Sequence, residues 1–150
     1  MIASSSSFTT YRAAVGACLL NEAHDRILVF QRSDTGTWQL PQGGIEPLET
    51  PEDALWREVA EETGFTQKDL RIVAEIPPRL LAYTLPHHLQ SEKTGLGQTV
   101  LWYYLQFHPD TWPVPQLGAE FTTCRWMPWV DFIDEWAAAF KRSMYEALQP

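Results

Sequence analysis

Cysteine is scarce in this sequence of 150 residues, which contains two, Cys18 and Cys124. They lie far apart in apolar, strand-like segments, and neither has a His or Cys neighbour at the spacing of a metal site. This pattern favours two buried free thiols, with a structural disulfide as the alternative. A fold that depends on several disulfides or on a cysteine-rich zinc site is excluded.

Long hydrophobic runs are also missing, because no apolar stretch approaches the roughly 20 residues that span a bilayer. Residues 1–7 lack the basic and apolar segments of a secretory signal. We therefore expect a cytoplasmic protein without a membrane segment. The serine-rich start predicts a disordered tail over residues 1–10, followed by one globular domain over residues 11–150.

Positive charge is in short supply, since 11 Lys and Arg stand against 19 Asp and Glu, a formal net charge of −8. Nucleic-acid binding draws most of its affinity from basic contacts with phosphates. The charge balance therefore argues against broad, non-specific binding of RNA or DNA. A local basic pocket for a few phosphates remains compatible with it.

The segments that are present alternate between strand and helix signals. Residues 11–20 and 26–32 are predicted to form a hairpin around the loop 21–25. Residues 38–40 predict a short strand that ends at Pro41, after which Gly43 and Gly44 are expected to open a loop.

Further strands are expected in the second half, over residues 70–76, 80–85, 100–107 and 122–127. The bulky run 100–107 is typical of a central strand buried on both faces. A final amphipathic helix is predicted over residues 134–148. Together these elements predict an α/β (α+β) domain with a mixed β-sheet.

The strongest local signal is a helix that begins after Thr50 and ends before Gly64. Thr50 is a good N-cap, Pro51 suits the first helical position, and Asp53 completes a variant of the capping box. Gly64 stands where a left-handed residue ends a helix.

Three glutamates share one face of this helix. Glu58, Glu61 and Glu62 occupy positions i, i+3 and i+4, which fall within an arc of roughly 100°. Crowded carboxylates raise one another's pKa unless a cation joins them, and Mg²⁺ prefers such oxygen ligands. A solvated acidic face is the alternative, because glutamate is a good helix former.

The segment before the helix favours the metal site. Gln42 and the two glycines after it form a stretch whose backbone can approach a metal or phosphate closely. Glu49 precedes the helix cap, and Arg57 adjoins the first of the three glutamates. An ion pair between Glu49 and Arg57 would pin this segment to the helix.

In this pattern the sequence resembles the Nudix box at each specified position: Gly43, Glu49, Arg57-Glu58-Val59, Glu61-Glu62 and Gly64-Phe65. Phe65 is an aromatic variant of the last position, and Leu48 stands where many members have glycine. The resemblance implies the Nudix fold, an α/β/α sandwich with a mixed β-sheet. It also implies that metal-assisted attack of water cleaves a phosphoanhydride bond in a nucleoside 5′-polyphosphate.

The resemblance further assigns roles to residues of the box. Glu58, Glu61 and Glu62 would bind Mg²⁺ or Mn²⁺ with help from the Gly43 carbonyl, and Glu58 is the first candidate to take the proton. Arg57 would complete the catalytic set by bracing the loop together with Glu49.

Outside the box, residues 38–45 resemble the Nudix branch of bacterial RNA pyrophosphohydrolases and diadenosine tetraphosphate hydrolases. In this branch an extra carboxylate approaches the metals, and Glu120 would supply it here, with a surface acid as the alternative. Five further residues are candidates for substrate contacts: Arg12, Arg32 and Lys141 for phosphates, Tyr83 for a base, and Gln42. A surface charge or a core position is the alternative for them.

The substrate depends on these weaker positions. Thr99, Val100 and Leu101 replace the polar or basic residues usual in the branch, and together with the acidic surface they favour a dinucleoside polyphosphate such as diadenosine tetraphosphate. RNA 5′-pyrophosphohydrolase activity on 5′-triphosphorylated mRNA is the alternative. A non-catalytic nucleotide-binding module is disfavoured, because the box keeps its arginine and its glutamates. The sequence leaves open a monomer or a homodimer.

Overall fold

The computed structural model describes residues 8–150 and contains two sheets. The larger sheet has five strands: β1 (Arg12–Leu19), β4 (Gln42–Gly44), β5 (Leu70–Ile72), β6 (Arg79–Thr84) and β7 (Gly97–Phe107). Their order is β4-β1-β7, and β5 and β6 both pair with β7. Because β1 and β7 run parallel while the other pairs are antiparallel, the sheet is mixed, as predicted.

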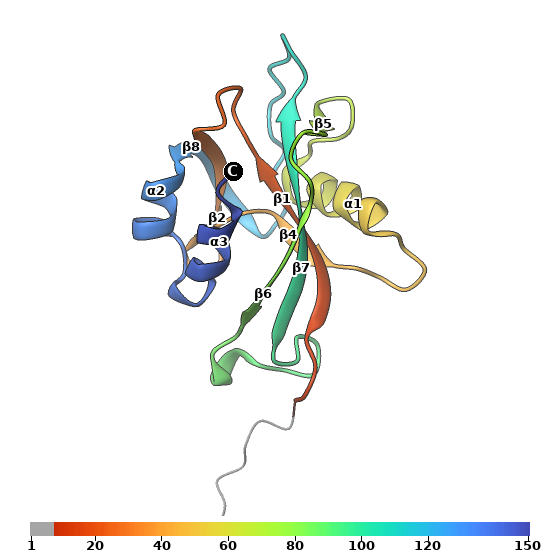
Figure 1. Cartoon of the computed structure of the whole chain (residues 1–150), viewed down its shortest axis with the longest axis vertical. Coiled ribbons are helices and arrows are strands. Elements are labelled where there is room, and N and C mark those ends of the chain that lie inside the picture. Colours follow the sequence, from red (N-terminus) through yellow and green to blue (C-terminus); the bar gives the residue numbers. More distant parts are fainter. Residues whose placement is uncertain (1–7) are drawn as a thin grey trace, which may run out of the picture.

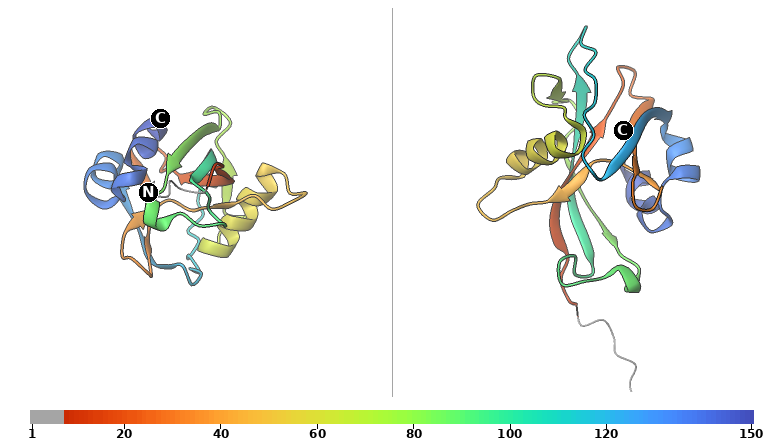
Figure 2. Two further views of the ribbon diagram at one scale, coloured as in Figure 1. Left: turned by 90° about the horizontal axis from the view of Figure 1, so that it is seen from below. Right: turned by 180° about the vertical axis from the view of Figure 1, so that it is seen from behind.

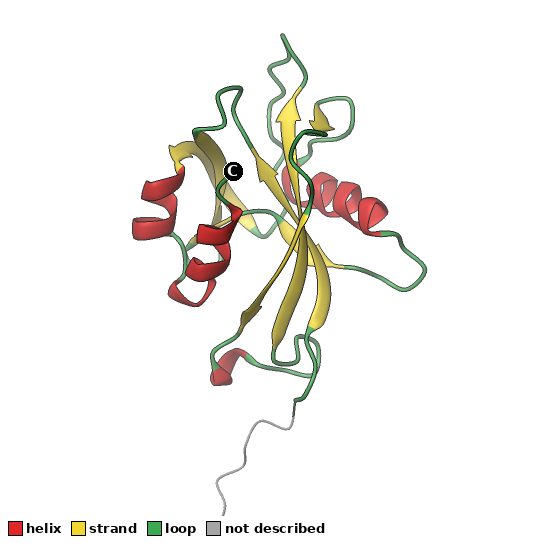
Figure 3. Ribbon diagram, viewed as in Figure 1, coloured by secondary structure: helices red, strands yellow, loops and turns green. Residues whose placement is uncertain are grey.

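The smaller sheet is antiparallel and has the order β3-β2-β8. It consists of β2 (Arg26–Arg32), β3 (Trp38–Gln39) and β8 (Phe121–Pro128). A register shift between Gln31 and Arg32 interrupts the pairing of β2 with β8. As Figure 3 shows, this sheet stands beside the larger one rather than extending it.

Helices flank the strands on two sides (Figure 1). Helix α1 (Pro51–Thr63) lies on one side, and the C-terminal helices α2 (Trp129–Asp131) and α3 (Arg142–Leu148) lie on the other. The view from behind in Figure 2 gives the same arrangement. The predicted α/β/α sandwich is confirmed. Among residues 8–150, no helix has the length and apolar character needed to cross a membrane.

The alternation of side chains along β1 and β7 explains this layering. Val15 and Tyr103 belong to one hydrophobic cluster, which includes Leu55 of α1. Cys18 and Trp102 belong to the other cluster, which includes residues of the C-terminal helices. The predicted central strand is confirmed, since β7 pairs along both edges and is covered on both faces. Both cysteines are free, Cys18 buried and Cys124 half-buried.

The predicted hairpin of residues 11–32 is wrong beyond its turn. Leu20 and Ile27 form one antiparallel bridge, and Asn21 N–H donates to the Arg26 carbonyl. The two strands then diverge, because β1 pairs with β4 and β7 while β2 pairs with β3 and β8. They therefore become members of different sheets.

The expected loop at Gly43 and Gly44 is also corrected, since both residues belong to strand β4. They pair with β1 in the register Val15 with Gly43 and Ala14 with Gly44. The loop begins after this strand, and within it Leu48 is fully exposed with a φ of 68°. Leucine therefore occupies a left-handed position that glycine would occupy without strain.

The single C-terminal helix predicted over residues 134–148 is broken. A π-helical turn, η2 (Phe132–Trp136), is followed by extended backbone at Ala137, a 3₁₀ turn η3 (Ala139–Lys141) and then α3. Ala137 forms a parallel bridge with Trp38 of β3. This tertiary pairing overrides the helix propensity of the alanine-rich stretch.

The predicted tail over residues 1–10 lies for the most part outside the described residues. Thr10, at its end, is joined to the domain, because its carbonyl accepts a hydrogen bond from Leu96 N–H at 2.9 Å.

Candidate active site

The predicted ends of α1 are confirmed. The Thr50 hydroxyl accepts from Asp53 N–H at 3.1 Å, and the Asp53 carboxylate accepts from Thr50 N–H at 3.3 Å. Gly64 ends the helix in the left-handed conformation, with a φ of 79°. These caps fix where the helix starts, and thereby the direction in which its glutamates point.

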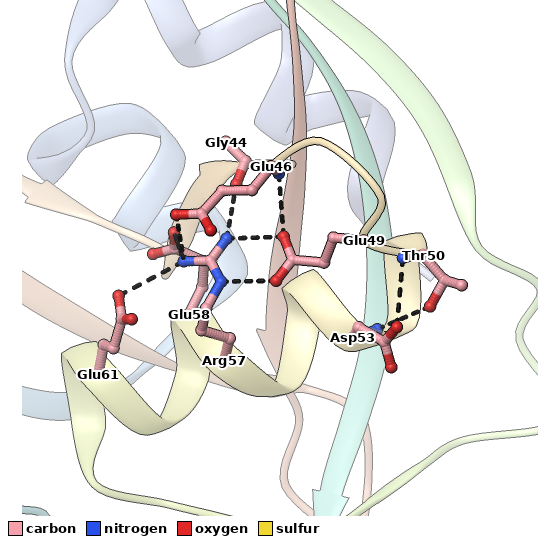
Figure 4. Close-up of polar contacts among 8 residues, drawn as sticks. All are labelled: Gly44, Glu46, Glu49, Thr50, Asp53, Arg57, Glu58 and Glu61. Atoms are coloured by element: carbon pink, nitrogen blue, oxygen red, sulfur yellow. Dashed lines mark hydrogen bonds and ion pairs between the residues drawn. The ribbon is translucent and has the colours of Figure 1, made fainter.

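Arg57 joins the helix to the segment before it (Figure 4). Its guanidinium donates to both carboxylate oxygens of Glu49, at 2.7 and 2.9 Å, and to the Gly44 carbonyl at 2.9 Å. It also donates to Glu58 Oε1 at 2.7 Å. The hydrogen bonds from Arg57 hold the pKa of Glu49 at about 2. The geometry therefore matches the predicted brace between Glu49 and Arg57.

Glu58 lies directly against Gly43 of β4. A Cβ atom at Gly43 would overlap the Glu58 carboxylate, so a larger residue would displace this carboxylate. Partial burial raises the pKa of Glu58, although the Arg57 guanidinium acts in the opposite direction. The glycine thus provides the space in which the carboxylate stands.

Glu62 is the most deeply buried of the three helix carboxylates, with 5% of its surface exposed. Its Oε2 atom has no hydrogen-bond partner within the described chain. Burial, followed by the nearby carboxylates of Glu120 and Glu58, raises the pKa of Glu62 to about 10. A buried carboxylate that lacks a cationic partner is costly, and a divalent cation would remove that cost.

The Glu61 side chain is directed towards Arg57 and solvent. It is 60% exposed and lies 3.5 Å from Arg57 Nη1. Within residues 8–150, no three Asp, Glu, His or Cys side chains are already arranged as a metal-binding group. Of the predicted ligands, Glu58, Glu62 and Glu120 share one cavity, and Glu61 lies outside its lining.

This cavity has a volume of about 510 Å³. Each predicted substrate contact lines it: Arg12, Arg32, Gln42, Tyr83 and Lys141. A Cβ atom at Gly44 would overlap the Arg12 guanidinium, so the two neighbouring glycines of β4 accommodate one carboxylate and one cation.

Two buried glutamines, neither of which has a role predicted from the sequence, connect these residues. Gln98 accepts hydrogen bonds from Gln42 Nε2 and from the Tyr83 hydroxyl. Gln39 accepts from Arg32 Nη1 at 3.2 Å and from Lys141 Nζ at 3.3 Å. Gln39 lies within the stretch 38–45 that carries the family resemblance, but strand periodicity alone does not show that these amides reach the cavity.

Lys141 and Arg32 differ in their surroundings. Lys141 is 7% exposed, and its Nζ lies 5.1 Å from the centre of the Tyr83 ring. Burial and the neighbouring Arg32 lower the pKa of Lys141 to about 8. Arg32 forms a two-pronged ion pair with Asp34, at 2.8 and 2.7 Å. Asp34 is a further residue of the cavity lining for which the sequence predicts no role.

Comparison with known proteins agrees with this geometry. The family model of the NUDIX domain matches residues 10–148. The RNA pyrophosphohydrolase of Photobacterium profundum is 37% identical over 141 residues, covering 90% of this chain and 79% of that protein. The RNA pyrophosphohydrolase of Vibrio vulnificus is 36% identical, covering 90% and 80%.

Solved structures with lower identity share the fold. The C. elegans Ap4A hydrolase superposes with a TM-score of 0.64 at 23% identity, covering 89% of this chain and 93% of that one. The E. coli dihydroneopterin triphosphate pyrophosphohydrolase gives a TM-score of 0.70 at 21% identity, with coverages of 94% and 98%. Fold and site thus define a sandwich domain with an acidic helix facing a cavity. The chain belongs to the Nudix family and is a Nudix pyrophosphohydrolase.

Proposed function

We propose that the chain hydrolyses a phosphoanhydride bond in a nucleoside 5′-polyphosphate with Mg²⁺ or Mn²⁺ as its cofactor. The main support is the cavity, which combines buried carboxylates with cations that can bind phosphates. The buried, unpartnered oxygen of Glu62 fits a hard cation, which prefers oxygen ligands. Nudix enzymes in general use divalent cations.

The carboxylates of Glu58, Glu62 and Glu120 would hold the cation, with the Gly43 carbonyl beside them. Bound metal lowers the pKa of water and neutralises phosphate charge. Glu58 is then suited to accept the proton of the attacking water, because it stands at the cavity wall and is oriented by Arg57. Glu61 is assigned to the outer edge of the site, where its carboxylate adds negative charge.

The phosphates would be held by Arg12, Arg32 and Lys141, which line the same cavity. Fixed cations offset polyphosphate charge, and Lys141 adds a buried ammonium group. Because Asp34 already pairs with Arg32, the net positive charge available to phosphates comes mainly from Arg12 and Lys141.

We place the 5′-triphosphorylated end of RNA first among substrates. The support is that relatives named RNA pyrophosphohydrolase are 34–37% identical along 90% of this chain. A dinucleoside polyphosphate, favoured by the sequence analysis, is the second candidate, and the net charge of −8 supports it. Net charge is summed over the whole surface, whereas the similarity covers 90% of the chain, so we give the similarity more weight.

A direct competition between the two substrates tests this order. Diadenosine tetraphosphate and a 5′-triphosphorylated RNA are supplied at equal concentration with the same Mg²⁺ and salt, and the products are identified by mass. We expect the RNA to be hydrolysed faster, with a rate that falls as salt is raised. Preference for diadenosine tetraphosphate would reverse the order, and binding of both without hydrolysis would contradict the proposed function.

The pH dependence of catalysis tests the role of Lys141. Below pH about 8 this lysine is charged, and above it the charge is lost, so its contact with phosphate weakens as pH rises. We expect Lys141→Met to lower kcat/KM about tenfold at pH 7, the size of one charge-assisted hydrogen bond. The ratio of the wild-type kcat/KM to that of the variant should then fall above pH 8. Lys68→Met, which changes an exposed lysine, serves as the control, and a ratio independent of pH would refute the assignment.

A further inference from the structure

Glu120 enters the cavity from a different part of the chain than α1, because it lies immediately before strand β8. Its carboxylate is close enough to Glu62 to raise the pKa of that residue. Two carboxylates at this separation repel each other when both are charged. The backbone around Glu120 must therefore be held in place by contacts of its own.

The first of these contacts is with the C-terminal end of α1. Gln116 N–H donates to the Thr63 carbonyl at 2.9 Å, and Gly118 N–H donates to the Glu62 carbonyl at 3.0 Å. The last carbonyls of a helix have no partner within the helix, so the loop satisfies them. The approach is tight, since a Cβ atom at Gly118 would lie 2.5 Å from the Glu61 carbonyl oxygen.

The second contact comes from Ser33, the residue after strand β2. Ser33 N–H donates to the Glu120 carbonyl at 2.8 Å, so the β2–β8 pairing continues beyond its register shift. The Ser33 hydroxyl lies 2.8 Å from the Ala119 carbonyl and 3.1 Å from that of Glu120, and its one proton serves both. A single serine thus holds the two carbonyls that flank the Glu120 Cα atom.

We propose that Ser33 is a positioning residue of the metal site, which holds Glu120 opposite Glu62 so that both carboxylates bind the same divalent cation. This inference rests on the proposed metal-dependent function. A metal ligand keeps its affinity only when the groups behind it fix its orientation. The tie to α1 sets the distance of the loop from Glu62, and the Ser33 hydroxyl fixes the two peptide units that flank the Cα atom of Glu120.

Mn²⁺ binding to the full chain, measured by electron paramagnetic resonance in the absence of substrate, tests this role. Ser33→Ala keeps the backbone hydrogen bond and removes the hydroxyl, and we expect about tenfold weaker Mn²⁺ binding. Ser33→Thr retains a hydroxyl and should restore most of the affinity. Ser143→Ala, at an exposed helix position, is the matched control and should bind Mn²⁺ as the wild type does.

A double variant separates positioning from a general structural effect. If Ser33 acts through Glu120, then Ser33→Ala should cause no further loss of affinity in a Glu120→Gln background. Unchanged binding in Ser33→Ala, or losses that add fully in the double variant, would overturn the proposal. Because no nucleotide is present, a protein that passes this test and yet hydrolyses no polyphosphate would contradict the proposed function alone.

Discussion

Glu62→Gln is expected to lower the hydrolysis rate at least ~100-fold, because it removes a charged metal ligand at the reacting centre. The same substitution should leave the metal-free protein as stable as the wild type, or more stable. At neutral pH this buried carboxyl group must keep a proton that the unfolded chain releases, and the neutral amide does not have that cost. Activity should therefore fall without a loss of stability, whereas a variant that was inactive because it unfolded would lose both.

The pH dependence of stability adds a second readout for Glu62. The pKa of Glu62 is about 10 in the folded, metal-free protein, whereas an ordinary glutamate, as in the unfolded chain, has a pKa of 4.5. Between these two pH values the folded state keeps a proton that the unfolded state has lost. Stability of the metal-free wild type should therefore fall as pH rises through this window. Thermal unfolding at several pH values should give a shallower fall for Glu62→Gln. Glu75→Gln, at an exposed position, is the control and should show the same fall of stability with pH as the wild type. If Glu62→Gln also shows the wild-type fall, then Glu62 does not have the raised pKa assigned to it.

Gly43→Ala is expected to lower kcat about 100-fold, the cost of displacing a reacting group by roughly 1 Å. The new Cβ would occupy the space of the Glu58 carboxylate. The φ of Gly43 is not positive, so alanine fits the backbone and the effect is steric. Steady-state kinetics should show the lower kcat, and the affinity for Mn²⁺ should also be lower, while the melting temperature changes little.

Gly44→Ala is the matched comparison in the same strand. Its Cβ would displace the Arg12 guanidinium instead of a carboxylate. We expect KM to rise several-fold, roughly the loss of one phosphate contact, while Mn²⁺ affinity stays at the wild-type value. If both alanine variants lost Mn²⁺ affinity, or if both only raised KM, then the assignment of Gly43 to the metal site and of Gly44 to the phosphate site would be wrong.

The sequence predicted the features of the site that depend on local spacing. The helix limits at Thr50 and Gly64 follow from capping chemistry, and the pairing of Arg57 with Glu49 matches the motif. The spacing did not predict that Glu61 points towards Arg57. Helical periodicity fixes the direction of each Cβ, whereas the carboxylate position depends on which neighbour it contacts.

Features that depend on long-range pairing were predicted less well. A short loop between two strands favours a hairpin, but the choice of partner for β1 is decided by β7, far along the chain. The alanine-rich stretch before Phe140 favours a helix, and its bridge to Trp38 breaks it. That break matters for the site, since the 3₁₀ turn that follows carries Lys141.

Because β1 and β2 diverge, two separate sheets contribute residues to the candidate site. The larger sheet and α1 supply Glu58 and Glu62, while the segments around the smaller sheet supply Arg32 and Glu120. Both sheets therefore contribute to each part of the proposed site, since Glu120 and Arg32 come from segments at the smaller sheet, whereas Glu58 and Arg12 come from α1 and the larger sheet. A substitution that shifts one sheet against the other is therefore expected to disturb metal binding and phosphate binding together.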